Sequence, residues 1–426
     1  MTVRSVAIGE IAVLNPKQPE LLSDDDITVP FLPMAAVRAD GDAPNEQRRR
    51  LADLTSGYTY FEKGDVLLAK ITPCFENGKV AHLGSLSHPF GFGSTEFHVL
   101  KAGPDVDPRY LYHAVRNPRF RRAGASSMTG SAGQRRVPAT FVARHRIPLP
   151  PLSEQQRIAA MLDKADAVQR KQRERIRLLD ELLRSAFLEM FGDPINHLRI
   201  RGLPAGWELV TVESIAARTT NACAGGPFGS SLTRADYIAT AGVPVIRGTN
   251  LVADRAIFRE EGFVFVTAEK AKELRRNVAR PGDIVFTQRG TLGQVARIPL
   301  DAKYPRYIVS QSQMKVTLDE TVVDPTYLVH YFLSTHARAD LEARTLTTGV
   351  PHINLSILKR FPVVLPPLAL QRRFAALASR FTICRRHMES ARSDADKLAN
   401  SLTQRAFSGD RTNVSHSIVI PLKTEA

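Results

Sequence analysis

The sequence predicts an α/β (α+β) protein in which two mixed domains occur in tandem repeat, together with two long helices that pair with each other. Three observations predict this fold class. The 426 residues exceed the usual size of one domain. Several segments of the first half return in the same order in the second half. In each half, a Leu-Pro-Pro-Leu segment leads into a long helical pattern.

The composition is typical of a globular protein. Hydrophobic residues make up 43% and charged residues 24% of the chain, which argues against disorder, collagen-like fibres and disulfide scaffolds. The longest apolar stretches fall short of the ~18 residues that span a bilayer, and Met1–Glu10 lacks the layout of a secretory signal. Cys74, Cys223 and Cys384 show no metal-binding spacing. We therefore expect a soluble, cytoplasmic protein with no membrane partner and no metal site.

The repeat rests on four segments of the first half that each have a counterpart in the second. The separation between counterparts grows from about 204 to 218 residues, which predicts an insertion near the start of the second half. The pairs are Val6–Ile11 with Val210–Ile215, Lys63–Leu68 with Pro281–Phe286, Asp107–Leu111 with Asp324–Leu328, and Leu149–Gln155 with Leu365–Gln371.

Each half begins with short runs rich in Val, Ile, Phe and Tyr that are broken by Gly, Pro and Asn. Such runs are typical of strands. Examples are Gly64–Ile71, Phe97–Lys101, Phe263–Thr267 and Gly282–Thr287. The sequence therefore predicts a domain at residues 1–151 and a second at 193–367.

The Pro-Pro stop of each half precedes a helix, predicted at residues 152–192 and 368–408, and a short tail follows at 409–426. Apolar residues advance by alternating steps of four and three, which is the spacing of a coiled-coil seam. Two matched helices of this length exceed what one small domain covers, so we expect them to pair with each other. The main seam residues are Ile158, Leu162, Ile176, Leu179 and Leu183 in the first helix, and Phe374, Leu377, Phe381, Met388, Leu398 and Leu402 in the second.

The net charge of +15 and the pI near 10 make a polyanion the leading class of partner. The turn after the Gly-Asp strand of each half carries side chains suited to base edges and phosphates. Arginine can bind guanine with two hydrogen bonds, glutamine can bind adenine, and glycine lets the backbone approach closely. The candidates are Lys70, Thr72, Asn77 and Lys79 in the first half, and Gln288, Arg289, Thr291 and Gln294 in the second.

A second basic cluster precedes each Pro-Pro stop. Its cations, amides and hydroxyls suit contacts to phosphate, with an affinity that falls as salt rises. The candidates are Arg121, Arg122, Thr129, Gln134, Arg135 and Arg136, and then Arg344, Thr348, His352 and Asn354.

The sequence contains few patterns that are typical of catalytic sites. The sequence has no Asn-Pro-Pro-aromatic motif and no GxxxxGK[ST] loop. The nearest nuclease-like pattern is Asp283 followed by Asp301-Ala302-Lys303, and Asp65 in the first half has no matching pair after it. We therefore predict no catalytic residue and no enzyme activity for this chain.

At these residues the chain resembles the DNA-specificity (S) subunits of type I restriction-modification systems, over about residues 5–410. The resemblance rests on the order of several motifs: the Gly-Asp-Val/Ile strands, Ile71–Lys79, Gly93–Leu100, Arg289–Gly293, and the two Leu-Pro-Pro-Leu segments that lead into helices.

This resemblance implies two target-recognition domains that each read one part of a split site on double-stranded DNA, and two helices that form an antiparallel coiled coil. It also implies two methyltransferase (M) subunits, which carry S-adenosylmethionine and adenine methylation. Two restriction (R) subunits would carry the nuclease and a motor that uses ATP and Mg. This chain would hold no cofactor, and the assembled complex would be a site-specific deoxyribonuclease and adenine methyltransferase of bacterial defence.

Two other classes of function remain open from the sequence. One is a free-standing nuclease or methyltransferase with an unfamiliar site, which assays of the purified chain alone would reveal. The other is a coiled-coil scaffold whose basic domains bind RNA or protein, which would show no sequence preference on duplex DNA.

Overall fold

The computed structural model describes residues 4–19, 27–39, 45–54, 56–131, 133–192, 202–239, 242–252, 255–345 and 352–408. The chain divides into two compact units. Unit 1 comprises Met1–Arg175 and Met388–Ala426, and unit 2 comprises Ile176–His387. The predicted tail and the candidate Thr348 lie outside the described residues.

Within its described residues, unit 1 forms a two-stranded sheet and two four-stranded sheets. Their orders are β1-β10, β2-β9-β6-β7 and β4-β3-β8-β5, with β3 and β8 parallel. The strands are β1 (Ser5–Ala7), β2 (Ala12–Leu14), β3 (Thr28–Leu32), β4 (Gln47–Arg50), β5 (Thr59–Glu62), β6 (Val66–Ala69), β7 (Val80–His82), β8 (Phe90–Gly93), β9 (Phe97–Ala102) and β10 (Arg146–Pro148).

Unit 2 repeats this topology with every strand label raised by ten. Its described sheets have the orders β11-β20, β12-β19-β16-β17 and β14-β13-β18-β15, and β13 and β18 are parallel. The structure therefore confirms the repeat. The strands are β11 (Glu208–Thr211), β12 (Cys223–Gly225), β13 (Val243–Ile246), β14 (Val264–Val266), β15 (Val278–Ala279), β16 (Ile284–Thr287), β17 (Val295–Arg297), β18 (Tyr307–Val309), β19 (Gln313–Val316) and β20 (Pro362–Leu365).

Short helices also correspond between the units. Asp107 and Asp324 each cap a helix whose first residue is proline, and their side chains accept backbone N–H groups of the first turn. The α-helices are α1 (Ile8–Ile11), α2 (Pro108–Arg116), α3 (Pro118–Ser126) and α4 (Ala139–Arg144) in unit 1, and α7 (Ala268–Glu273), α8 (Pro325–Leu333), α9 (Thr335–Ala343) and α10 (Leu355–Lys359) in unit 2. The 3-10 helices are η1 (Met34–Ala36), η2 (Leu51–Asp53), η3 (Gly229–Ser231), η4 (Arg234–Asp236), η5 (Gly248–Asn250) and η6 (Arg275–Asn277).

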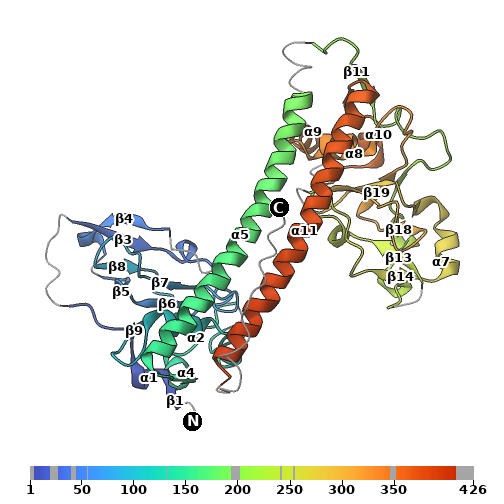
Figure 1. Ribbon diagram of the computed structural model, residues 1–426. Coiled ribbons are helices and arrows are strands. Elements are labelled where there is room, and N and C mark those ends of the chain that lie inside the picture. The colour runs from blue at the N-terminus through green and yellow to red at the C-terminus, as the bar shows by residue number, and fades with distance from the viewer. Residues whose placement is uncertain are drawn as a thin grey trace, which may run out of the picture. The chain divides into compact units, whose positions relative to one another are not determined.

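The two long helices are α5 (Leu152–Phe191) and α11 (Leu368–Ala406), and each contributes to both units. In unit 1, Ile158 near the start of α5 and Leu402 near the end of α11 belong to one core. In unit 2, Phe187 near the end of α5 packs on Phe374 near the start of α11. The helices therefore pair in an antiparallel coiled coil, and their pairing can be followed in Figure 1.

Most of the residues predicted for the seam are buried or half-buried. Ala399 is 8% exposed, whereas Leu398, which was expected in the seam, is 48% exposed. Residue 399 lies four after Ala395 and three before Leu402, so it takes the inward position instead. The buried predicted residues are Ile158, Leu162, Ile176, Phe374 and Leu402, and the half-buried ones are Leu179, Leu183, Leu377, Phe381 and Met388.

Candidate nucleic-acid interface

In unit 1, the two basic segments predicted to contact nucleic acid lie side by side. One is the turn after β6, at residues 70–79, and the other is the segment 129–136. Ile71 and Arg136 form a β-bridge between them, and the backbone N–H of Thr72 donates across the same junction. Folding thus joins two clusters that are distant in the sequence into one surface.

The predicted contact residues of unit 1 are all exposed or half-buried. Arg121 of α3 also joins the turn, because its guanidinium lies against Gly78. A Cβ added at Gly78, which has a φ of +76°, would lie 2.6 Å from Nη1 of Arg121. The exposed residues are Asn77, Arg122, Thr129, Gln134 and Arg135, and the half-buried ones are Lys70, Thr72, Lys79, Arg121 and Arg136.

Several of these side chains are already bonded within the protein. Arg136 donates two hydrogen bonds to the carboxylate of Glu96, one from Nε at 2.9 Å and one from Nη2 at 2.7 Å. This hydrogen bonding lowers the pKa of Glu96. The ammonium of Lys79 donates to the Met34 carbonyl oxygen at 3.0 Å, and Thr72 donates to the carboxylate of Glu76. These three side chains shape the turn.

Unit 2 has an equivalent surface. The turn after β16, at residues 288–294, meets the segment 352–354 through a bridge between Arg289 and His352. The backbone N–H of Ile353 donates to the Gln288 carbonyl oxygen at 3.1 Å. Arg289 and Thr291 are exposed, whereas Gln288 and His352 are half-buried.

Three predicted contact residues of unit 2 serve the fold. The Gln294 amide accepts a hydrogen bond from Thr287 and donates to the Leu251 carbonyl oxygen. The Asn354 side chain caps α10 by accepting the Ile357 N–H at 2.8 Å. Arg344 forms an ion pair with Asp340 on α9.

Arg338 of α9 is not among the contact residues that the sequence predicted. In the fold it is the counterpart of Arg121. A Cβ added at Gly293, which has a φ of +79°, would lie 3.1 Å from Nε of Arg338. Each unit therefore places an arginine against the glycine of its turn. The glycine and the arginine are 43 residues apart in the first half and 45 in the second, and this similar separation is a signal that could have identified Arg338.

The repeated Gly-Asp pair has a structural role. Asp65 and Asp283 are 3% and 4% exposed, and each accepts the backbone N–H of the residue three positions earlier, Glu62 or Arg280. Burial raises the pKa of Asp65 to about 6. Asp283 also accepts the Thr317 hydroxyl at 2.6 Å, so the carboxylate of the nuclease-like pattern is engaged within the fold.

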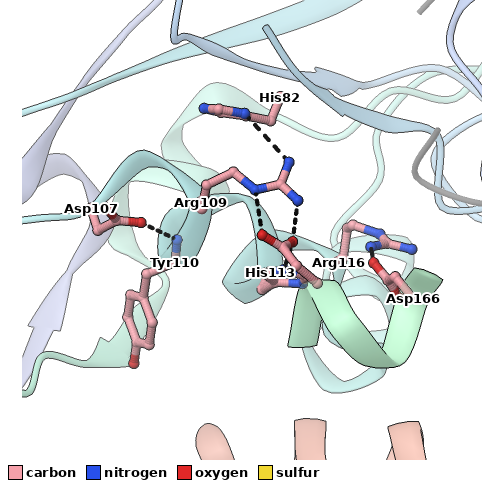
Figure 2. A network of polar contacts seen from close by, with 8 residues as sticks. His82, Asp107, Arg109, Tyr110, His113, Arg116 and Asp166 are labelled. Carbon is pink, nitrogen blue, oxygen red and sulfur yellow. Dashed lines mark hydrogen bonds and ion pairs between the residues drawn. The ribbon is translucent and has the colours of Figure 1, made fainter. Parts of the chain in front are cut away.

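A polar network that the sequence did not predict ties α2 to α5 in unit 1 (Figure 2). Asp163 of α5 accepts hydrogen bonds from Arg109 and His113, and Arg116 pairs with Asp166. Burial raises the pKa of Asp163, but the hydrogen bonds from His113 and Arg109 outweigh it and lower the pKa to about 2.

At the same junction in unit 2, uncharged residues replace the ion pair of Arg116 and Asp166. By the repeat, Leu333 takes the place of Arg116 and Thr382 that of Asp166. Both line a cavity of about 560 Å³, whose wall also includes His330. Burial lowers the pKa of His330 to about 4, and its ring packs edge-on against Phe374.

Among the residues that the structure describes, no group of three or more His, Cys, Asp or Glu side chains is arranged to hold a metal ion. No helix in the described part of the chain is long and apolar enough to cross a membrane.

Curated relatives resemble parts or most of the chain. The specificity subunits of the Escherichia coli type I restriction enzymes EcoAI and EcoEI are 43% identical over 153 residues and 38% identical over 161 residues. These alignments cover 35% and 37% of this chain but 26% and 27% of those proteins. The MjaVIII specificity subunit of Methanocaldococcus jannaschii is 21% identical over 413 residues, which is 93% of this chain and 91% of that protein.

Solved structures share the fold. A chain from work on complex assembly and conformational transition of the type I R-M system has a TM-score of 0.52 and 20% identity, covering 95% of this chain and 97% of that one. The S subunit of the M. genitalium type I system has a TM-score of 0.51 and 14% identity, covering 95% of this chain and 96% of that one.

The family model for the type I restriction modification DNA specificity domain matches residues 2–178 and 236–392, which is most of the chain and one copy in each half. The chain therefore belongs to the family of type I restriction-modification DNA specificity subunits.

Proposed function

We propose that this chain reads a bipartite site on double-stranded DNA and that each unit reads one part of it. The observation that carries the proposal is the convergence, in both units, of a polar turn with a second segment that lies far along the chain. Ile71 meets Arg136 in unit 1, and Arg289 meets His352 in unit 2. A polar hairpin with no binding role would not require the same junction in both units.

The charges at these two surfaces suit a polyanion. Arg122 and Arg135 in unit 1 and Arg289 in unit 2 are exposed, and the whole chain carries a net charge of +15. Contacts of such cations with phosphate supply affinity and position the protein, while hydrogen bonds to base edges supply specificity. We assign Arg122 and Arg135 to phosphate and Arg289 to base edges.

The two turns carry different side chains on one topology, so they would read different sequences. In unit 2, Gln288 and Arg289 have the hydrogen-bonding groups for adenine and guanine. In unit 1, Asn77 and Gln134 supply exposed amides. Gln294 and Arg136 hydrogen-bond to Leu251 and Glu96 within the protein, so they would position the turns rather than touch DNA.

The family suggests how the chain acts on its site. We propose that it holds no catalytic residue and no cofactor, and that it assembles with two M subunits and two R subunits. S-adenosylmethionine would then bind the M subunits, and ATP with Mg would bind the R subunits. The complex would act in the cytoplasm, where bacterial DNA is found, and the paired helices α5 and α11 would receive the M subunits.

Sequencing of methylated bases in the host, with and without this chain, tests the proposal. One bipartite adenine-methylated motif should disappear when the chain is removed and return when it is restored. Unchanged methylation would contradict the proposal. So would methyl transfer or DNA cleavage by the purified chain alone, which would indicate a free-standing enzyme.

A further inference from the structure

Phe228 is the most exposed of the large hydrophobic residues in the described part of the chain, with 91% of its surface accessible. It lies just after β12, at the tip of a loop that ends at Leu232. Leu232 is 2% exposed and belongs to a core cluster of unit 2. The loop is therefore anchored at its far end while the aromatic ring points to solvent.

Several contacts hold this loop in place. The Gln311 amide donates to the carbonyl oxygens of Gly229 at 2.6 Å and Leu232 at 2.9 Å. Gly226 has no room for a side chain, because a Cβ there would lie 2.0 Å from the Ser310 carbonyl oxygen. The loop thus packs its backbone directly against the turn that contains Gln311 and presents Phe228 on an ordered support.

The same turn supports the candidate reading residues. The backbone N–H groups of Gln288 and Arg289 donate to the Ser312 carbonyl oxygen at 2.7 and 3.3 Å. A Cβ added at Gly225 would lie 3.6 Å from Oε1 of Gln288. The loop of Phe228 and the turn of Arg289 are therefore neighbours on one side of unit 2.

Exposure alone would carry little weight, since isolated apolar residues are common on protein surfaces. Leu300 is 70% exposed and lies against Gly282, which precedes β16. Gln288 and Arg289 follow β16, so Leu300 lies near the opposite end of that strand. Phe228 differs from Leu300 in its position next to the reading turn and in its anchored loop. Apolar side chains contribute to base recognition through contacts such as that of phenylalanine with the methyl group of thymine.

We propose that Phe228 makes an apolar contact with DNA base edges beside those read by Gln288 and Arg289, and that it adds to the specificity of unit 2. The inference rests on the proposed function of DNA reading. Residues 15–26, which follow β2 at the corresponding place in the first half, contain no aromatic residue, so the contact would belong to one half-site only.

Site-directed photo-crosslinking tests the contact in the complete complex. The full chain is assembled with its M subunits on a duplex that carries the methylated motif. A photoreactive residue is introduced as Phe228→p-benzoylphenylalanine, with Leu300→p-benzoylphenylalanine as the matched control. Position 228 should cross-link to bases of one half-site, whereas position 300 should not cross-link to DNA.

Binding measurements provide the second readout. Phe228→Ala should weaken binding of the methylated motif by about five-fold or more, while Leu300→Ala should leave the affinity unchanged. Both residues are exposed. Midpoints of thermal unfolding equal to that of the unaltered chain would show that both variants fold normally.

The outcomes separate the inference from the proposed function. If Arg289→Ala weakens binding but Phe228→Ala does not and position 228 cross-links to no base, the inference is overturned and DNA reading stands. Cross-linking of position 228 to an M subunit would also overturn it. If the unaltered complex shows no preference for any duplex sequence, the proposed function fails and the inference with it.

Discussion

The side-chain oxygen of Gln155 accepts a hydrogen bond from the backbone N–H of Asp107 at 2.9 Å. In unit 2, Gln371 accepts the N–H of Asp324 in the same way at 2.8 Å. Both glutamines are almost fully buried, at 1% and 0% exposed. Each lies in the first turn of a long helix and contacts the residue that caps α2 or α8.

The opposite end of each glutamine binds the Pro-Pro stop. Nε2 of Gln155 donates to the Pro150 carbonyl oxygen at 2.9 Å, and Nε2 of Gln371 donates to that of Pro366 at 2.7 Å. One amide therefore connects the start of the long helix, the segment before it and the cap of a shorter helix. This explains why a glutamine follows Leu-Pro-Pro-Leu in both halves.

Replacing Gln155 with Leu should lower the free energy of unfolding by about 1–3 kcal/mol, because it leaves the Asp107 N–H and the Pro150 carbonyl buried without partners. The neighbouring Gln156 is exposed, so Gln156→Leu is a matched control that should change stability little. Chemical denaturation of both variants measures the difference. Equal losses would show that the amide of Gln155 contributes no more than a surface residue.

The sequence predicted the parts of the fold that depend on local pattern. The helices begin at Leu152 and Leu368, directly after the Pro-Pro stops, and β6 and β16 follow the two Gly-Asp pairs. Proline, glycine and apolar spacing act within a few residues, so they can be read without the fold. The tandem repeat added evidence, since each pattern occurred twice.

The roles of individual polar side chains required the fold. Gln294 donates to the carbonyl oxygen of Leu251, 43 residues earlier, and Arg136 binds Glu96, 40 residues earlier. Local spacing carries no information about such partners. The prediction that Leu398 lies in the seam was wrong for another reason. From Ala395 to Leu402 the seam can advance by three and then four residues, or by four and then three. Both orders keep the seam on the same helix face, so the spacing did not distinguish Leu398 from Ala399.

Asp163 should make the stability of unit 1 depend on pH. Its pKa of about 2 lies below the value of 3.8 for an unperturbed aspartate, so its ion pairs stabilise the fold above about pH 4 and lose this effect as the pH falls toward 2. Since its side chain is 34% exposed, Asp163→Asn should cost only about 1 kcal/mol at pH 7, and the cost should shrink at pH 3. Urea denaturation at both pH values measures it.

Asp394 provides the control for this experiment. It lies in unit 1 on α11, its side chain is 70% exposed, and it pairs with Lys397 within the same helix. Asp394→Asn should change stability little at either pH. A cost for Asp163→Asn that stays the same at pH 7 and pH 3 would contradict the proposed role of the carboxylate charge.

Gly78→Ala should weaken DNA binding through Arg121. A Cβ at this position would displace the guanidinium of Arg121 from the turn. Gly57, which lies outside the two segments of the candidate surface, has a similar φ of +78° with no atom within 4 Å of an added Cβ, so Gly57→Ala carries the same backbone strain without the displacement. Both variants should lose about 1 kcal/mol of stability. Only Gly78→Ala should lower the affinity for DNA further, and equal affinities of the two variants would argue against a role for Arg121.

Arg289 and Arg122 should affect DNA binding in different ways, because we assign one to base edges and the other to phosphate. Arg289→Ala should weaken binding to the methylated motif by about 1–3 kcal/mol and leave binding to scrambled duplexes nearly unchanged. Arg122→Ala should weaken binding to both duplexes and reduce the slope of log affinity against log salt by about one. Binding isotherms on the two duplexes at several salt concentrations measure both effects. Equal losses on both duplexes for Arg289→Ala would assign Arg289 to the phosphate backbone and leave Gln288 as the reader of that turn.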